Sequence, residues 1–587
     1  MPRKSGRKRT WRFVALLVVF AGLLLLVVGR LTYLQVIAGP AYARMAFEQR
    51  NREMDIPPRR GSIYDREGEP LAVSMEARDI YAVPTSIKDP EGAASAIAGI
   101  LGGTAEEYLL KLKKDSPFVY IARKVDLERA AALESLALEG IGFQDSSRRV
   151  YPSNELACQV LGFVGVDDGG LDGIEKYYDE LLAGTPGKLI AEKGSRGIPI
   201  PGGVSVQEDA VNGENIVLTI DKDIQYQAHV ELQKAVEKWK AQAGSVLIMD
   251  PDTGAILAMA STPSFDPNNF SKADPQSFRN RPIVDTYEPG STIKSLTAAA
   301  VIEEKLFTSA SMFDLPPTLK IGGRTIHESH PRGRVQWSLT DIVTNSSNVG
   351  AVKLGIALGE DRLYAYFAKF GLTEKTGVDF PGEATGWLPP PSQWSASSIG
   401  NIPFGQGVSV TPLQLARALA AIANGGELVT PHFLDSLPDS PEKSVVWPKE
   451  TALSSKTASD MRTVLEAVVY EGTGAAAGVN GYTVAGKTGT AQKARTDGVA
   501  GYEAGKYIAS FSGFVPADDP AVLIIVTLDE PSNSIFGGTV AAPTFSTLAA
   551  YCMEHLKIPP SPKKPVSSEA TVAPSVPATG GSQSDTE

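Results

Sequence analysis

A run of sixteen residues without a polar side chain, Phe13 to Val28, lies close to the start of this 587-residue chain. Coiled into a helix, such a run is about 24 Å long, a little short of a bilayer core. The apolar residues that continue past Arg30 bring the helix to full span, because arginine can snorkel toward the interface. We therefore predict one transmembrane helix over residues 13–37.

The basic residues ahead of this run predict the orientation of the helix. Residues 1–12 contain six lysines and arginines, which the positive-inside rule keeps in the cytoplasm, with the chain after residue 40 outside. A cleaved signal peptide is the alternative, with Ala41-Tyr42-Ala43 as a cleavage site. The length of the run, and Arg30 between it and that site, favour a single-pass anchor in the cell membrane.

Composition excludes several classes of function for the remaining chain. At 43% hydrophobic residues it can form two or three domains with cores, and its net charge of −11 gives no case for binding nucleic acid. Cys158 and Cys552 have no zinc-site spacing, and a disulfide between them stays open as an alternative. In His327-Glu328-Ser329-His330 the histidines lack H-E-x-x-H spacing, so we interpret this segment as a loop rather than a metal site.

Residues 45–215 are expected to form a first extracytoplasmic domain of mixed α+β structure. Charged residues around Gly68 predict a hairpin turn, and helical patterns occur near Glu91 to Leu101 and Glu106 to Lys113. No catalytic constellation emerges from this region. We interpret it as a spacer that holds the next domain away from the membrane.

Residues 216–557 are expected to form a second domain around one sheet. Together with a strand that carries Lys487, two hairpins give five strands of an antiparallel sheet covered by helices, an α/β (α+β) fold. A strand at Ile216 stands outside this sheet without an identified partner, and residues 558–587 have the Pro- and Ser-rich composition of disorder. The four hairpin strands are predicted at Ser245–Met249, Ile256–Ala260, Tyr507–Val515 and Val522–Leu528.

A serine and a lysine three residues apart begin a helical segment in this domain. Ser291-Thr292-Ile293-Lys294 follows Pro289-Gly290 and precedes an alanine-rich run that ends near Glu304. This spacing puts both side chains on one face, where the amine can reach the hydroxyl. A serine nucleophile needs such a base and the positive potential of a helix N-terminus. Alone, the pattern favours a capped helix with an exposed lysine.

Two further motifs follow downstream, Ser346-Ser347-Asn348 and Lys487-Thr488-Gly489-Thr490. The order S-x-x-K, S-x-N, K-T-G is the set found in penicillin-binding proteins and related β-lactamases, here with Ser-Ser-Asn in the middle. Singly, Ser346 could be only a helix cap and Lys487 only an exposed strand charge. Three motifs in this order indicate one catalytic site.

With these motifs, the chain resembles a class B penicillin-binding protein over nearly its full length. Val484–Gln492 is most similar to the septal and spore-cortex group, and no glycosyltransferase domain of the class A kind is recognised before the spacer, or pedestal, domain. Further segments also carry the resemblance: Arg60–Arg66, Gly173-Ile174-Glu175, Phe404-Gly405-Gln406-Gly407 and Glu471-Gly472-Thr473-Gly474.

The resemblance implies a peptidoglycan D,D-transpeptidase that needs no metal or cofactor. Ser291 would attack the carbonyl between two D-alanines of a stem peptide. Lys294 would take the hydroxyl proton, with its pKa lowered by burial and by the charge of Lys487. Ser346 would relay the proton to the leaving amine, and Asn348 would orient Lys294 and the substrate amide.

The same resemblance implies how the substrate binds. The segment Lys487–Thr490 would lie at a strand edge, to which the stem peptide adds as an extra strand. The hydroxyls of Thr488 and Thr490, with the Lys487 charge, suit the terminal carboxylate. Backbone N–H groups of Ser291 and Thr490 would form the oxyanion hole.

The implied ligands are stem peptides that end in D-Ala-D-Ala, and β-lactams. The implied partners are the membrane, a SEDS-family glycosyltransferase and other division proteins, in septal wall synthesis during division or sporulation. A β-lactam sensor or β-lactamase-like hydrolase is one alternative, but no group that activates deacylating water is identifiable by motif. A non-enzymatic division scaffold is another, against which the intact Ser291, Lys294 and Lys487 argue.

Overall fold

The computed structural model describes residues 7–192, 205–495 and 501–561. Residues 1–6 of the predicted basic tail and residues 562–587 of the predicted disordered tail lie outside this description. Internal contacts divide the chain into two compact units. Unit 1 comprises Met1–Arg59 and Gly184–Gly213, and unit 2 comprises Arg60–Ala183 and Glu214–Glu587.

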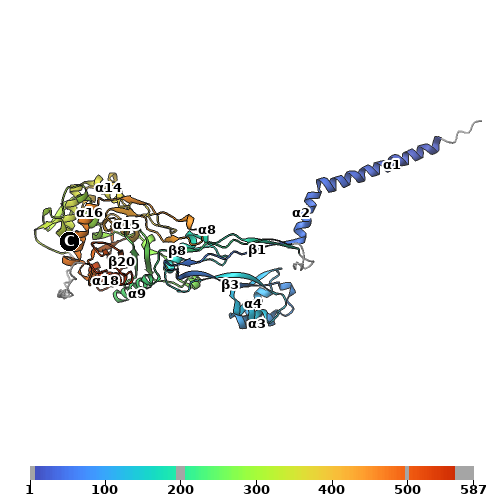
Figure 1. Ribbon diagram of the computed structural model, residues 1–587, viewed down its shortest axis with the longest axis horizontal. Coiled ribbons are helices and arrows are strands. Elements are labelled where there is room, and N and C mark those ends of the chain that lie inside the picture. Colours follow the sequence, from blue (N-terminus) through green and yellow to red (C-terminus); the bar gives the residue numbers. More distant parts are fainter. Residues whose placement is uncertain (1–6, 193–204, 496–500, 562–587) are drawn as a thin grey trace, which may run out of the picture. The chain divides into compact units, whose positions relative to one another are not determined.

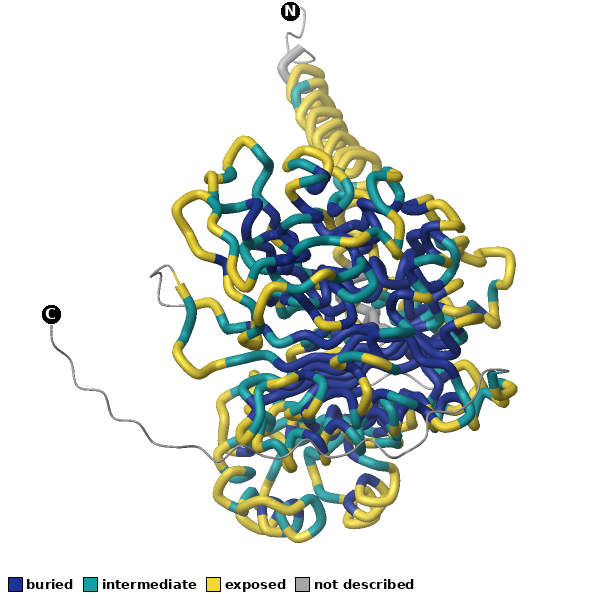
Figure 2. Tube along the Cα trace, turned by 90° about the vertical axis from the view of Figure 1, so that its left-hand side faces the viewer, coloured by how far each residue is buried: buried dark blue, intermediate teal, exposed yellow. Residues whose placement is uncertain are grey.

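Unit 1 contains the predicted apolar helix. Helix α1 (Arg7–Thr32) runs without a break into one π-helical turn, η1 (Tyr33–Ile37), and is followed by α2 (Gly39–Arg50) (Figure 1). Within it, Thr10–Ile37 is long and apolar enough to cross a membrane. Its side chains are exposed almost throughout, and Figure 2 draws this helix in yellow. A soluble core helix would bury such a surface, so the exposure fits a lipid-facing segment.

The remainder of unit 1 is a three-stranded antiparallel sheet with the order β1-β6-β7. The strands are β1 (Asn51–Ile56), β6 (Gly187–Glu192) and β7 (Ser205–Glu208).

Unit 2 begins with a six-stranded sheet whose path is β16-β8-β2-β3-β4, with β5 paired to β3. Gly68, with φ of +86°, makes the turn from β2 to β3 as the sequence predicts. The isolated strand at Ile216 also finds its partners here, because β8 pairs in parallel with β2 and antiparallel with β16. The strands are β2 (Ile63–Tyr64), β3 (Pro70–Ala82), β4 (Val119–Asp126), β5 (Ile141–Val150), β8 (Ile216–Leu218) and β16 (Leu434–Ser436).

Helices α3 (Pro90–Leu101), α4 (Ala105–Leu112) and α5 (Leu127–Glu134) pack their apolar faces on this sheet around Ile80 and Ile97. Thr104 and Glu107 form a capping box at the start of α4. Three short helices follow further along the chain: α6 (Cys158–Leu161), α7 (Gly173–Tyr177) and α8 (Asp179–Leu182).

A buried ion network stabilises the start of this sheet. The carboxylate of Glu175 is 0% exposed and accepts hydrogen bonds from Arg60 Nε (2.7 Å) and Arg149 Nε (2.6 Å). Tyr151 Oη donates a third, at 3.2 Å. A buried carboxylate is tolerated only when it is paired in this way. Arg60 and Glu175, two of the residues behind the family resemblance, therefore support the fold.

The second sheet of unit 2 has five strands in the order β10-β9-β20-β19-β18, and all neighbours are antiparallel. This confirms the sheet predicted from the sequence. Strand β18 lies at one edge, so one of its sides has no strand partner within the described residues. The strands are β9 (Ala243–Met249), β10 (Ile256–Thr262), β18 (Ala485–Ala494), β19 (Tyr502–Val515) and β20 (Val522–Asp529).

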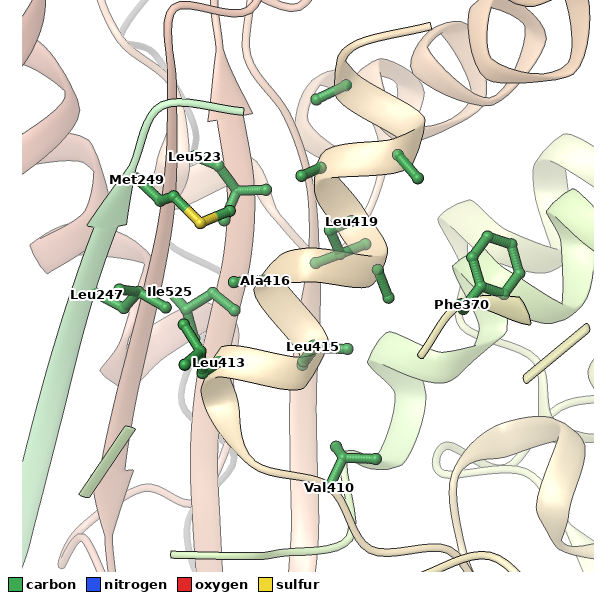
Figure 3. Packing of buried hydrophobic residues seen from close by; sticks show 14 of the residues in the cluster. Leu247, Met249, Phe370, Val410, Leu413, Leu415, Ala416, Leu419, Leu523 and Ile525 are labelled. Carbon is green, nitrogen blue, oxygen red and sulfur yellow. The ribbon is translucent and has the colours of Figure 1, made fainter. Parts of the chain in front are cut away.

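Helices cover both faces of this sheet. On one face α9 (Lys222–Trp239) and α18 (Ala542–His555) bury Leu232 and Phe545. On the other face lies α15 (Pro412–Ala423), every residue of which is buried. Figure 3 shows side chains of α15, Leu413 and Ala416, beside Leu247 of β9 and Ile525 of β20.

A helical block lies in the chain between β10 and β18 and carries the first two motifs. Its α-helices are α10 (Arg281–Val284), α11 (Ile293–Glu303), α12 (Leu339–Thr344), α13 (Asn348–Leu358), α14 (Glu360–Lys369), α15 and α16 (Ser455–Glu471). Three strand pairs accompany them: β11 (Met312–Leu315) with β14 (Val335–Ser338), β12 (Thr318–Ile321) with β13 (Arg324–His327), and β15 (Glu427–Val429) with β17 (Lys449–Thr451). Cys158 and Cys552 are both buried and free, so they form no disulfide.

Candidate active site

Ser291 lies in a 3₁₀ turn, Gly290–Thr292, that leads directly into α11. The α-helix therefore begins at Ile293, two residues after the serine that the sequence placed in its first turn. The Ser291 side chain is half-buried, and Gly290 adopts φ of +54°, a conformation that favours glycine. The turn holds the serine at the positive end of α11.

The loop at Gly405 fixes this turn from behind. Gly290 N donates to Gly405 O at 3.2 Å, and a Cβ atom at residue 405 would lie 2.1 Å from Gly290 O. Only glycine allows so close an approach, and the φ of Gly405 is +89°. Gly407 N also donates to the Glu288 carboxylate at 2.9 Å. The segment Phe404–Gly407 thus supports the serine turn.

Lys294 is 1% exposed and points to the second motif. Its Nζ donates to Ser346 O at 2.5 Å, to Asn348 Oδ1 at 2.7 Å and to Ser346 Oγ at 3.2 Å. Among the described residues, no hydrogen bond joins Lys294 to the Ser291 hydroxyl. The structure therefore brings Lys294, Ser346 and Asn348 together, with Ser291 three residues before Lys294 in the turn that leads into α11.

The second motif occupies the sharp turn between α12 and α13. Ser346 has φ of +55°, which is strained for a residue with a side chain, and it turns its carbonyl and hydroxyl to Lys294. Ser347 caps α13 by accepting a hydrogen bond from Gly350 N at 2.9 Å. Asn348 is the first residue of α13. Backbone strain of this kind persists only where the surroundings hold it in place.

The third motif lies on edge strand β18, against the serine turn. A Cβ atom at Gly489 would lie 3.0 Å from Thr292 Oγ1 and 2.3 Å from Ser510 Oγ. A larger residue at this position would push the strand away from the turn. The missing side chain therefore lets the Lys487–Thr490 segment lie next to Ser291.

The threonine hydroxyls of this segment already have protein partners. Thr488 Oγ1 lies 2.9 Å from Thr473 Oγ1 and accepts a hydrogen bond from Lys487 Nζ at 3.3 Å. Thr490 Oγ1 accepts from Gly537 N at 3.2 Å. The sequence did not identify a role for Thr473, because its contact with Thr488 depends on the packing of two distant backbone segments.

Two further residues that hold the site were missed from the sequence. The Glu328 carboxylate accepts a hydrogen bond from Asn348 N at 2.7 Å, and His327 O accepts one from Asn348 Nδ2 at 2.8 Å. Both belong to the His327–His330 segment, which its sequence predicts to be a loop. Residue 327 ends strand β13, and the rest of the segment begins the loop toward β14.

Burial dominates the electrostatics of the two lysines. It lowers the pKa of Lys294 well below its ordinary value, Lys487 lowers it further, and Glu328 opposes both by raising it. Burial alone lowers the pKa of Lys487, which is 0% exposed, to about 7. Neither ammonium forms an ion pair with a carboxylate within the part of the chain that the structure describes. Such a site can supply a neutral amine base and can take up an anion.

No group of three or more potential metal-ligand side chains lies together in residues 7–192, 205–495 and 501–561.

Comparison with protein families gives two matches. The penicillin binding protein transpeptidase domain family matches residues 244–550, and the penicillin-binding protein dimerisation domain family matches residues 55–218. The three motifs, α15 and nearly all of the five-stranded sheet lie in the first of these ranges, whereas α9 precedes it. Fold and family together define a penicillin-binding transpeptidase.

Individual relatives indicate the subgroup of penicillin-binding transpeptidases to which the chain belongs. The chain is 36% identical to Stage V sporulation protein D of Bacillus subtilis, covering 91% of this chain and 84% of that protein. It is 33% identical to peptidoglycan D,D-transpeptidase FtsI of Escherichia coli, covering 94% and 93%. A solved structure of penicillin binding protein 3 from Mycobacterium tuberculosis, complexed with aztreonam, superposes with a TM-score of 0.69 at 32% identity, covering 87% and 99%. The chain belongs to the class B penicillin-binding proteins of the septal and sporulation group, which are peptidoglycan D,D-transpeptidases.

Proposed function

We propose that Ser291 is the nucleophile of this transpeptidase and that Lys294 is its base. The observation that carries the proposal is the state of Lys294, a fully buried amine with a strongly lowered pKa, held by Ser346 and Asn348 one turn after Ser291. A lysine must be neutral to accept a proton, and burial beside a second lysine favours that state. Ser346 and Asn348 orient the amine.

The first half of the reaction forms an acyl-enzyme. Ser291 Oγ bonds to the carbonyl carbon between the two terminal D-alanines of a stem peptide, and its proton passes to Lys294. The C–N bond then breaks, and the proton reaches the leaving nitrogen by way of Lys294 and Ser346. Free D-alanine departs, and the rest of the peptide remains as an ester on Ser291.

The second half transfers the acyl group. An amine of a neighbouring stem peptide attacks the ester carbonyl, the bond to Ser291 Oγ breaks, and the amine proton returns to that oxygen. The product is a new amide, which cross-links two strands of peptidoglycan. A β-lactam enters the same first step, because its strained amide presents a similar carbonyl. Ser291 Oγ bonds to that carbonyl carbon, the lactam C–N bond breaks and takes up the proton, and the opened molecule stays on Ser291 as an ester with its leaving amine still tethered.

Substrate binding is assigned to the free edge of β18. The stem peptide adds there as an extra antiparallel strand, which places its carbonyl over the start of α11. The N–H groups of Ser291 and Thr490 form the oxyanion hole, which is worth about 3 kcal/mol for each donor. Lys487 becomes fully protonated when the terminal carboxylate arrives, and Thr488 and Thr490 add hydroxyl contacts.

We also propose the organisation of the whole chain. Residues 1–12 form a cytoplasmic tail, 13–37 the membrane anchor, 45–215 the pedestal and 216–557 the extracytoplasmic transpeptidase domain. The tail predicted to be disordered over 558–587 still packs on this domain at its start, because Ser561 N donates to Gly481 O at 2.9 Å. The anchor and pedestal contact a SEDS-family glycosyltransferase and other division proteins, so that cross-linking accompanies glycan synthesis at the septum during division or sporulation. The exposed apolar helix and the match of residues 55–218 to the dimerisation domain family support this organisation.

The experiment that tests the function supplies a donor stem peptide ending in D-Ala-D-Ala and an acceptor stem peptide to the purified full-length protein in detergent. The wild type should release D-alanine and form the cross-linked dimer in equal amounts. Ser291→Ala should do neither while keeping its melting temperature within a few degrees. Release of D-alanine by Ser291→Ala would contradict the assignment of the nucleophile.

A further inference from the structure

We propose that Glu328 is a positioning residue for the reaction, because its carboxylate holds the turn that presents Ser346 and Asn348 to Lys294. This inference rests on the proposed function of Lys294. The Glu328 side chain is 6% exposed and lies just after β13, in the loop toward β14. No sequence motif of the family resemblance includes it.

Both oxygens of this carboxylate bind the second motif. Oε1 accepts a hydrogen bond from Ser347 Oγ at 2.6 Å, and Oε2 accepts one from Asn348 N at 2.7 Å. Ser347 Oγ in turn accepts from Gly350 N, which closes the first turn of the eleven-residue helix α13. A negative charge at a helix N-terminus is stabilised by the helix dipole and by its free N–H groups. Glu328 thus extends the Ser347 cap.

The same loop also sets the direction of the Asn348 amide. His327 O accepts from Asn348 Nδ2 at 2.8 Å, which leaves Oδ1 facing Lys294 Nζ at 2.7 Å. If the amide turned over, its NH₂ group would face the Lys294 amine. That group can only donate a hydrogen bond, so it would compete for the lone pair that must accept the Ser291 proton. Residues 327 and 328 therefore fix both the backbone and the side chain of Asn348.

Arg332 anchors the Glu328 carboxylate from the other side. It forms an ion pair with Glu328, and its Nη1 donates to Leu315 O at 3.1 Å and Gly333 O at 2.9 Å. Its guanidinium lies 4.7 Å from the centroid of the Trp337 ring. With its partner held at this many points, the carboxylate has little freedom to leave the turn.

Because it lies near Lys294, Glu328 also affects the pKa of this proposed base. The charged groups that act on Lys294 are Lys487 on β18, which lowers its pKa, and Glu328, which raises it. The α12–α13 turn and the loop at Phe404 present uncharged groups to it. Removing the Glu328 charge should therefore lower the pKa of Lys294 further.

The test measures the rate of acylation by a fluorescent penicillin across pH, using the full-length protein. Glu328→Gln keeps the size of the side chain and removes its charge. We expect its plateau rate to fall at least about tenfold, because a buried N–H of the turn loses its charged acceptor. We also expect the acidic limb of its pH profile to move to lower pH, whereas Glu328→Asp should keep the wild-type limb.

Glu303→Gln is the matched control. Glu303 caps α16 by accepting from Ser454 N at 3.1 Å and Ser454 Oγ at 2.7 Å, and it lies at the far end of α11, about 14 Å from Lys294. This variant should acylate like the wild type.

Three results would each contradict either the positioning role of Glu328 or the proposed function. A Glu328→Gln protein with the wild-type rate and pH profile would overturn the positioning role. A lower melting temperature with an unchanged pH profile would leave only a structural cap, and would overturn it as well. Failure of the wild type to label at Ser291 would instead contradict the proposed function.

Discussion

Two lysines at the site are withdrawn from solvent almost completely, with 1% of Lys294 and 0% of Lys487 exposed. An ammonium group that is buried without a carboxylate partner is costly, so each lysine favours its neutral form. The surroundings of the two lysines nevertheless differ, which suits them to different roles. Lys294 is held by an amide oxygen, a hydroxyl and a carbonyl close to the proposed nucleophile, whereas Lys487 lies on the edge strand proposed to receive an anionic substrate.

The two lysines predict a bell-shaped pH dependence for acylation by a penicillin that carries a carboxylate. Folding lowers the pKa of Lys487 from its ordinary 10.5 to about 7, so this lysine loses its proton as the pH rises through 7. The rate should fall above that pH by up to about tenfold per unit, because anion binding requires the proton. It should also fall in acid, where Lys294 gains a proton. Stopped-flow fluorescence measures both limbs.

Lys487→Arg provides the control for the alkaline limb, since an arginine keeps its charge over the whole range. In this variant the fall above pH 7 should disappear, at whatever plateau rate the larger side chain allows. An unchanged alkaline limb would show that another group titrates there.

At the scale of elements, the site is assembled where three segments meet. The serine turn before α11, the α12–α13 turn and strand β18 come from distant parts of the chain, and small residues set their spacing. Gly489 lets β18 approach Thr292, and Gly405 lets its loop approach Gly290. These two glycines matter because a Cβ atom at either position would lie too close to the neighbouring segment.

Gly405→Ala tests this assembly. The new Cβ atom would lie 2.1 Å from Gly290 O, and the backbone at φ of +89° disfavours any side chain. We expect the free energy of unfolding to fall by about 2–4 kcal/mol and penicillin labelling to fall with it, because strain and overpacking add. Thermal unfolding and gel fluorescence measure the two effects.

Gly425→Ala is its counterpart, because Gly425 has the same φ of +89° and nothing within 4 Å of a Cβ atom. This variant carries the backbone strain without the clash and should lose only about 1 kcal/mol with normal labelling. Equal losses in the two variants would mean that close packing at Gly290 has no special role.

The elements also show what a sequence can predict. The five strands were predictable, since runs of apolar residues between turn signals are local. The nearness of Ser291 and Lys294 was predictable as well, because only three positions of the chain separate them. The partners of β8 and the contacts of Glu328 were not. Glu328 reaches Ser347 and Asn348 across a loop, 19 and 20 residues along the chain, and no periodic pattern records such a meeting.

At the scale of the molecule, α1 differs from the other long helices. Thr10–Ile37 exposes its apolar side chains, whereas the apolar α13 and α15 of unit 2 are core helices. An apolar helix is therefore identified as membrane-spanning only when its length and composition are considered together with its exposure. The hydrophobic cores around Ile80, Leu232 and Leu413 all lie within unit 2.

The anchor predicts where the protein is found. Full-length protein should remain with membranes through carbonate extraction, whereas Leu24→Arg, in the middle of the apolar run, should lower the membrane-inserted fraction. Arginine at that depth costs about 2.5–3.5 kcal/mol of insertion free energy. Leu110→Arg, at a side chain that is 73% exposed on α4, should change nothing. Wild-type protein in the soluble fraction would contradict the prediction.

The most direct test of the account is the site of acylation by a fluorescent penicillin. Wild-type and Ser291→Ala proteins would be labelled side by side, digested, and the labelled peptide identified by mass spectrometry. We expect a single stable adduct on the peptide that contains Ser291, and no adduct in the folded Ser291→Ala protein. An adduct that persists in Ser291→Ala, or that maps to another residue, would contradict it.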